Sequence, residues 1–235
     1  GLPVMSSSFE SDWTPPVDPD LQEILHGAQL DVMGKQYAVA LAKHLWFHEN
    51  ALRIDSAMSG VRLSFALSYW YRLGQEYQPA MEKLKEARDA AKAEVLAGTK
   101  VSESFRDYSA INRTLDEEDE TRKLFVSLDQ QSEDAAKTVF HVAMPALIKA
   151  GEFQLCGKYL EPKRYYELTK NLFRMDRAST RSEQHREMQR DFSKKRFTNT
   201  VSTLIGLLVV NNRFDEAKEI MVDAKKEWVD ASFHS

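Results

Sequence analysis

The sequence predicts an all-α fold of stacked antiparallel helix hairpins, on three observations. Residues that lose little side-chain freedom in a helix, chiefly Ala, Leu, Glu, Lys, Arg, Gln and Met, dominate the composition. Gly (9) and Pro (7) are scarce among the 235 residues, and no Asn-Gly or Asp-Gly hairpin signal occurs. Apolar residues recur at three- and four-residue steps, the period of an amphipathic helix, as in Tyr77, Ala80, Leu84, Ala87, Ala91 and Val95.

Residues 1–18 are predicted to form an extended N-terminal segment docked on the body of the protein. Ser6 to Ser8 and Trp13 to Pro16 favour turns over helix, and Phe9 or Trp13 is expected to anchor the segment. Asp18-Pro19 is expected to open the first helix, because an acidic residue can cap it and proline's missing N–H is harmless there.

Residues 19–235 are predicted to form a single helical-repeat domain. Its hairpins are expected at about residues 19–53, 56–97, 101–129, 132–160 and 195–231, with a charged helical insertion at 161–194. Gly34 and Gly74 are expected at the turns within the first two hairpins, because glycine accepts the left-handed backbone of a helix end. Gly98, Gly151 and Asn212 are expected to end later helices in the same way.

Side-chain caps and a proline mark the central helices. Thr114 with Glu117 has the spacing of a capping box, and Ser132 can cap the helix that follows it. Pro145 lies inside that helix and is expected to kink or break it, because proline lacks the N–H that a helix needs.

A recurring pattern at the turns is the most informative feature of the sequence. Each of four turn residues is followed by an aromatic residue and, three positions after it, by a small residue. The pairs are Tyr37 with Ala40, Tyr77 with Ala80, Phe153 with Cys156, and Phe214 with Ala217. The aromatic residue is expected to fill the angle between two helices, and the small residue to let the helices approach closely.

This pattern resembles the tetratricopeptide repeat. The residues that carry the resemblance are Leu67, Ser68, Tyr71, Gly74, Tyr77, Ala80, Leu84 and Ala87, together with Arg213-Phe214-Asp215-Glu216-Ala217. The resemblance implies a divergent, right-handed tetratricopeptide-like α-solenoid over about two thirds of the chain. The aromatic residues are 40, 76 and 61 positions apart rather than a uniform 34, so a helix-hairpin array of another lineage stays the alternative.

The resemblance also implies a function, because the first helix of each tetratricopeptide hairpin lines a concave groove that holds a peptide or a partner's helix. The chain is therefore expected to be a non-catalytic protein-protein interaction or scaffold module. The candidate partner-binding residues are Arg62, Phe65, Tyr69 and Arg72, with Gln22, Leu25 and Gln29 before them and His141 and Lys149 after them. The alternative is that Phe65 and Tyr69 are buried and the arginines merely solvated.

Two other functions stay open for the charged part of the chain. Segment 161–196 could drive self-association as an assembly or regulatory subunit, including a homodimer. Segment 158–196 carries 12 Lys and Arg against 6 Asp and Glu, so it could also bind nucleic acid or another anion. Its charges alternate in sign, which favours a self-paired helix face over a nucleic-acid site.

No catalytic or cofactor motif is recognisable, so we expect no enzymatic activity and no cofactor. The alternative is an enzyme whose site is assembled from scattered residues, which leaves no motif in the sequence. His44 and His48 share a helix face as a possible metal pair, and the alternative is two half-buried histidines beside Trp46 and Phe47. Cys156 is expected to be a core residue rather than a nucleophile.

The compartment stays open. No apolar run is long enough to span a membrane, so a protein without membrane insertion is expected. The chain begins with Gly1 rather than Met, which is compatible with a cytoplasmic location or with export after removal of a leader.

Overall fold

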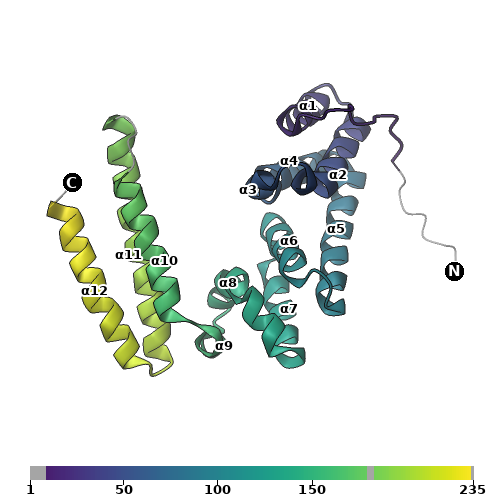
Figure 1. Cartoon of the computed structure of the whole chain (residues 1–235). Coiled ribbons are helices and arrows are strands. Elements are labelled where there is room, and N and C mark those ends of the chain that lie inside the picture. Colours follow the sequence, from purple (N-terminus) through teal and green to yellow (C-terminus); the bar gives the residue numbers. More distant parts are fainter. Residues whose placement is uncertain (1–8, 179–182, 234–235) are drawn as a thin grey trace. The chain divides into compact units, whose positions relative to one another are not determined.

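The computed structural model describes residues 9–178 and 183–233, and all regular structure in these ranges is helical (Figure 1). The all-α prediction is confirmed, and consecutive helices pack on one another. The chain divides into two compact units, Gly1–Ala146 (unit 1) and Leu147–Ser235 (unit 2), and each is described by itself. A single repeat domain over residues 19–235 stays a prediction, since a solenoid also divides into locally packed parts.

Unit 1 begins with an extended segment and continues as paired helices. Ser6 to Ser8 of the predicted segment lie outside the described residues. Phe9 packs against the core of unit 1, and the Trp13 ring meets the Trp46 ring edge-on at 6.2 Å. Docking of the whole segment 1–18 stays a prediction. The helices are α1 (Leu21–Met33), α2 (Tyr37–Ile54), the 3₁₀ turn η1 (Ser56–Met58), α3 (Ser59–Arg62), α4 (Phe65–Glu76), α5 (Gln78–Ala97), α6 (Val101–Thr114), α7 (Glu118–Gln131) and α8 (Glu133–Lys149), whose last three residues belong to unit 2.

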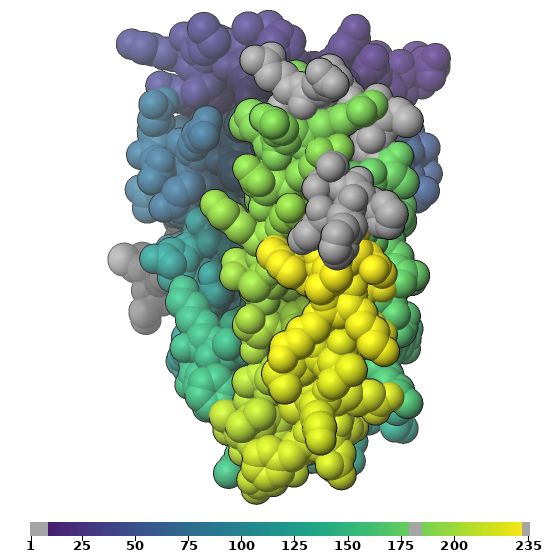
Figure 2. Space-filling model, turned by 90° about the vertical axis from the view of Figure 1, so that its left-hand side faces the viewer, coloured from purple at the N-terminus to yellow at the C-terminus, as the bar shows by residue number. Residues whose placement is uncertain are grey.

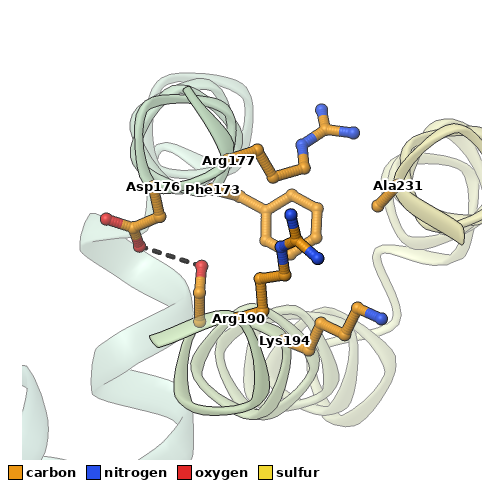
Figure 3. A pocket seen from close by; sticks show the side chains of 7 residues that line it. Phe173, Asp176, Arg177, Arg190, Lys194 and Ala231 are labelled. Atoms are coloured by element: carbon orange, nitrogen blue, oxygen red, sulfur yellow. Dashed lines mark hydrogen bonds between the residues drawn. The ribbon is translucent and has the colours of Figure 1, made fainter. Parts of the chain in front are cut away.

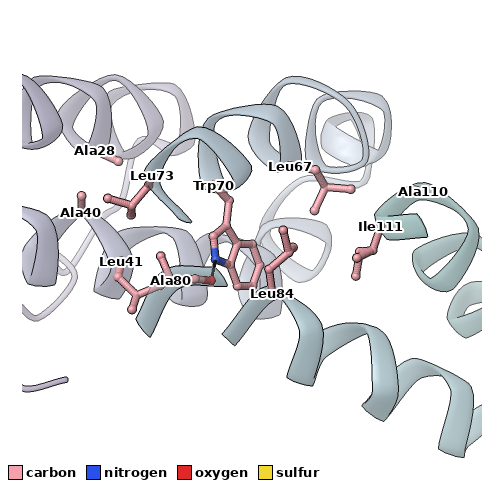
Figure 4. Packing of buried hydrophobic residues seen from close by; sticks show 10 residues of the cluster. All are labelled: Ala28, Ala40, Leu41, Leu67, Trp70, Leu73, Ala80, Leu84, Ala110 and Ile111. Carbon is pink, nitrogen blue, oxygen red and sulfur yellow. Dashed lines mark hydrogen bonds between the residues drawn. The ribbon is translucent and has the colours of Figure 1, made fainter. Parts of the chain in front are cut away.

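The core of unit 1 is built around Trp70 of α4 (Figure 4). The indole Nε1–H donates a hydrogen bond of 2.9 Å to the carbonyl of Ala80, which satisfies the one polar atom of a fully buried ring. Ala40 and Ala80 are fully buried, as the turn pattern predicts. Tyr37 and Tyr77 are half-buried and stack on each other at 5.7 Å, so the same position of two successive hairpins forms one contact.

Two glycines of unit 1 act differently from the prediction. Gly74 lies inside α4, and a Cβ there would come within 3.1 Å of the Met81 backbone, so this glycine permits a close approach of α4 and α5. The backbone of Gly34 has φ −85°, and Lys35 takes the left-handed conformation with φ 59°. Gly98 has φ 76°, as predicted.

The capping of the helices agrees with the sequence in part. Asp20 rather than Asp18 caps α1, and its carboxylate accepts from the backbone N–H of Gln22 at 3.0 Å. Ser132 accepts from the N–H of Ala135 at 3.3 Å, which confirms that cap.

The predicted capping box at Thr114 is wrong. The Thr114 hydroxyl donates to the Ala110 carbonyl at 2.9 Å within its own helix, and a left-handed Asp116 (φ 57°) makes the turn. The first half of the predicted hairpin 56–97 is not one helix, because it is interrupted at Leu63 and Ser64. Helix α8 continues through Pro145, so the break predicted as one outcome there does not occur.

Unit 2 consists of α9 (Phe153–Tyr159), α10 (Pro162–Arg177), α11 (Glu183–Val210) and α12 (Phe214–Phe233). Helices α10, α11 and α12 pack in pairs, and α9 packs on α11; Figure 2 shows α12 alongside α11. The rings of Phe173 and Phe197 stack at 4.4 Å in the core. Helix α11 runs without a break across residue 194, so the predicted insertion and the predicted last hairpin share a helix.

The turns of unit 2 confirm two left-handed positions and correct the role of the aromatic residues. Gly151 (φ 77°) and Asn212 (φ 60°) are left-handed, as predicted. The small residues Cys156 and Ala217 are buried, but Phe153 and Phe214 are exposed and fill no helix angle. Polar side chains link these elements instead: Asn211 donates to the Phe153 carbonyl at 2.9 Å, and Arg213 to the Gly157 carbonyl at 3.1 Å.

Candidate functional site

Three of the predicted partner-binding residues form one line along α4. Phe65, Tyr69 and Arg72 are four and three residues apart, so they share a helix face, here called the α4 stripe. The Phe65 side chain is 62% exposed, and the Arg72 guanidinium lies 5.8 Å from the centre of the half-buried Tyr69 ring. The buried face of α4 is supplied by other residues, Ala66, Leu67, Trp70, Leu73 and Gly74, so the core does not need the stripe.

Arg62 does not belong to this exposed line. It is 7% exposed, and its guanidinium donates to both carboxylate oxygens of Asp107, at 2.6 and 3.0 Å. It also donates to the backbone carbonyl of His48 at 2.7 Å and lies 3.2 Å from the ring nitrogen Nε2 of the same residue. The break at Leu63 and Ser64 separates α3, which carries Arg62, from α4. Through its hydrogen bonds to His48 and Asp107, Arg62 joins α3 to α2 and α6.

The other candidate residues are spread over α1 and α8. Gln22 is exposed and Gln29 half-buried on α1, whereas Leu25 is buried in a small core cluster with Phe47. His141 is exposed on α8, and its Nε2 lies 3.3 Å from a guanidinium nitrogen of Arg106 on α6.

Lys149 is exposed at the end of α8 and belongs to unit 2. Of the predicted partner-binding residues in unit 1, those of the α4 stripe therefore lie together on one exposed helix face.

The histidine pair of α2 packs on Trp70 rather than converging on a common point. The His44 ring stacks on the indole at 6.3 Å, and the His48 ring meets it edge-on at 5.5 Å. Burial lowers the pKa of His44 to about 4. The pKa of His48 is also lowered to about 4, chiefly by burial and then by the nearby Arg62 charge, while the Asp107 carboxylate acts in the opposite direction. Neutral histidines are the form this packing stabilises. No group of three or more metal-binding side chains occurs within residues 9–178 and 183–233.

Cys156 lies in the core of unit 2 as a free thiol. Burial and the neighbouring charge of Glu152 raise the pKa of this thiol to about 11. A thiol with that pKa stays protonated at neutral pH and is a weak nucleophile.

Two helices of unit 2 carry exposed apolar side chains, where the sequence pattern indicated only charge. Leu168, Leu172 and Met175 of α10 and Met188 and Phe192 of α11 are large, apolar and exposed. Between the two helices is a hollow of about 200 Å³ whose lining includes Leu168, Leu172 and Phe197, and it is called the α10–α11 groove below. The spacing of Leu168, Leu172 and Met175 is a sequence signal that the many charges of segment 161–196 obscured.

The charges of α10 are largely neutralised by α12. Lys163 meets Glu219 at 3.6 Å, and Lys170 meets Asp223 at 3.2 Å. The Tyr166 hydroxyl also donates to Asp223 at 2.6 Å, and these two hydrogen bonds lower the pKa of the Asp223 carboxyl. Arg174 and Arg177 both reach the buried Glu227. These cations are therefore engaged within unit 2, and a phosphate backbone would have to compete for them.

Comparisons of the chain with protein-family models, with curated proteins and with solved structures found no match. Function is therefore inferred from geometry alone. Across the described ranges, no helix has the length and apolar character needed to cross a membrane.

Proposed function

We propose that the chain is a non-catalytic interaction module that binds a partner protein through the α4 stripe. The observation that carries this proposal is the exposure of Phe65 in line with Tyr69 and Arg72. Aromatic and arginine side chains are the residue types that most often dominate the energy of protein interfaces. An exposed phenylalanine costs hydration free energy that a partner would recover on binding.

The proposed architecture is a tetratricopeptide-like solenoid of antiparallel hairpins, in which α4 is the first helix of its pair. Two findings support it: the buried alanines at Ala40 and Ala80, and the stacking of Tyr37 on Tyr77 at equivalent positions 40 residues apart. In such an array the proposed occupant is an extended peptide or one helix of the partner. Buried Arg62 is assigned a structural role, and Phe65 is the main anchor.

A photo-crosslinking amino acid at position 65 tests this proposal in a lysate of the source organism. The matched control carries the same crosslinker at Leu96 of α5, which is 45% exposed and distant in sequence. We expect one protein to be crosslinked at position 65 and not at position 96. The crosslink should disappear when Tyr69→Ser and Arg72→Ser are added, with the fold checked by circular dichroism. A product that is the same at both positions, or that survives the two substitutions, contradicts the proposal.

Self-association through the α10–α11 groove is the second candidate function. It is favoured by the exposed Leu168 and Leu172 in the lining of the groove and by further exposed apolar side chains on the same two helices. Light scattering over a concentration series should show a dimer that Leu172→Ser with Phe192→Ser dissociates. The control, Val209→Ser with Val210→Ser, replaces two exposed apolar residues at the end of α11 and should leave the dimer intact. A monomer at all concentrations excludes this candidate.

A further inference from the structure

Three cationic side chains of unit 2 converge on one small cavity between α10 and α11. Arg177, Arg190 and Lys194 surround the ring of Phe173, with Ala231 of α12 at the opposite wall (Figure 3). The cavity has a volume of about 30 Å³, and a neighbouring one of about 50 Å³ shares Arg177 and Arg190. This group of cations is independent of the α4 stripe and of the α10–α11 groove's apolar residues.

The two acidic side chains nearby are already engaged by other residues. Asp176 accepts from the Ser193 hydroxyl at 2.9 Å and pairs with Arg196. In Figure 3 the Asp176 carboxylate points away from the three cations, and its dashed line marks the hydrogen bond from Ser193. Glu227 pairs with Arg174 and Arg177, so one carboxylate serves two guanidinium groups.

The cations lining the cavity therefore lack sufficient counter-charge. Within the part of the chain that the structure describes, Arg190 forms no hydrogen bond or ion pair, although it is half-buried. Among the described residues, the contact of the Lys194 ammonium is with the Trp228 ring, whose centre lies at 5.9 Å. Glu187 and Asp191 are close in sequence on α11 but form no ion pair with these cations. The excess is three positive charges. Arg190 and Lys194 each contribute one, and the third arises because Glu227 neutralises only one of its two partners, Arg174 and Arg177.

The geometry points to a binding site for a phosphoryl group, as free phosphate or as a phosphate monoester. Guanidinium groups donate paired hydrogen bonds that match the oxygens of a phosphate, and cations aimed from two helices suit a tetrahedral anion. A phosphate dianion neutralises two of the three excess charges, whereas a carboxylate neutralises one. Pockets that enclose a whole drug-sized ligand have volumes of roughly 300 Å³ or more, so this site would hold one anionic group with the rest of any ester outside.

Titrations of the full chain followed by NMR of the arginine Nε–H signals test this inference. The ligands are inorganic phosphate, a phosphoserine peptide, its unphosphorylated form and acetate, all at constant ionic strength. Arg190→Gln with Lys194→Gln removes the two cations that lack acidic partners. Lys195→Gln with Lys225→Gln removes the same charge from exposed residues that do not line the cavity. Arg190→Lys keeps the positive charge but loses the planar guanidinium group that can donate two parallel hydrogen bonds.

We expect saturable phosphate binding that weakens about tenfold or more in the Arg190 and Lys194 double variant, since each lost cation removes charged hydrogen bonds to the phosphate oxygens. The control should change binding less than about twofold, and Arg190→Lys should fall between them. Tighter binding of the phosphoserine peptide than of phosphate identifies an ester as the source, and equal binding identifies free phosphate. Equal weakening in both double variants, acetate binding as tight as phosphate, or no saturation overturns the inference.

Discussion

The buried contact between Arg62 and Asp107 should carry a large share of the stability of unit 1, and Asp107→Ala tests this. The substitution removes both carboxylate oxygens from a guanidinium that is 7% exposed. Removing one partner of a fully buried ion pair costs about 3–5 kcal/mol. Asp107 is partly open to water, and Arg62 keeps its bond to the His48 carbonyl, so a loss of about 2–3 kcal/mol is expected here.

Urea unfolding measures this loss. The background substitution Trp228→Phe leaves Trp13, Trp46 and Trp70 as reporters, and all three lie in unit 1. With a slope of about 2 kcal/mol per molar urea, the midpoint should fall by about 1–1.5 M.

The matched control for this measurement is Asp89→Ala. Its carboxylate is 69% exposed and pairs with Arg88, so the free energy of unfolding should change by less than about 0.5 kcal/mol. If Asp107→Ala costs no more than Asp89→Ala, the structural role assigned to Arg62 is wrong, and Arg62 becomes available as a partner contact.

Three further predictions concern stability and reactivity. The pKa values of His44 and His48 are about 4 in the folded chain and about 6.5 when unfolded, so the unfolded chain binds more protons between these values. The free energy of unfolding should therefore fall as the pH drops from about 6.5 to about 4, by about 3 kcal/mol for each histidine. Urea titrations at several pH values measure this fall, and His44→Leu should remove about half of it. Gly74→Ala should lower the free energy of unfolding by about 1–3 kcal/mol because its Cβ meets a backbone, whereas Gly206→Ala, with open space around it, should raise it by up to about 1 kcal/mol. Cys156 should react with a thiol reagent only when the chain is unfolded, and fast modification of the native protein would contradict its assigned burial.

Local signals in the sequence predicted three helix ends correctly, whereas the caps expected at Asp18 and Thr114 and the left-handed turn expected at Gly34 were wrong. Gly98, Gly151 and Asn212 end helices in the left-handed conformation because that geometry depends on a few neighbouring residues. Gly74 was misassigned because a glycine that permits a close helix contact has the same sequence signature as one that ends a helix. Its contact with Met81 depends on how α4 and α5 pack, which no local pattern specifies.

The candidate site was also predictable only where it depends on local helix geometry. Helical periodicity alone places Phe65, Tyr69 and Arg72 on one face, and the structure has that arrangement. Arg62 fits the same period, but the break at residues 63 and 64 removes it from the line, and its partner Asp107 is 45 residues away. Pairing over such a distance leaves no mark in a single sequence.

The affinity of the purified crosslinked partner for the Phe65→Ala chain is the measurement that tests the proposed function most directly. The matched control is Leu96→Ala, which truncates another exposed apolar side chain in unit 1. If Phe65 anchors the interface, its truncation should weaken binding by about tenfold or more, and that of Leu96 by less than about twofold. Equal affinities for the Phe65→Ala and unsubstituted chains would contradict the assignment of the α4 stripe as the partner-binding surface.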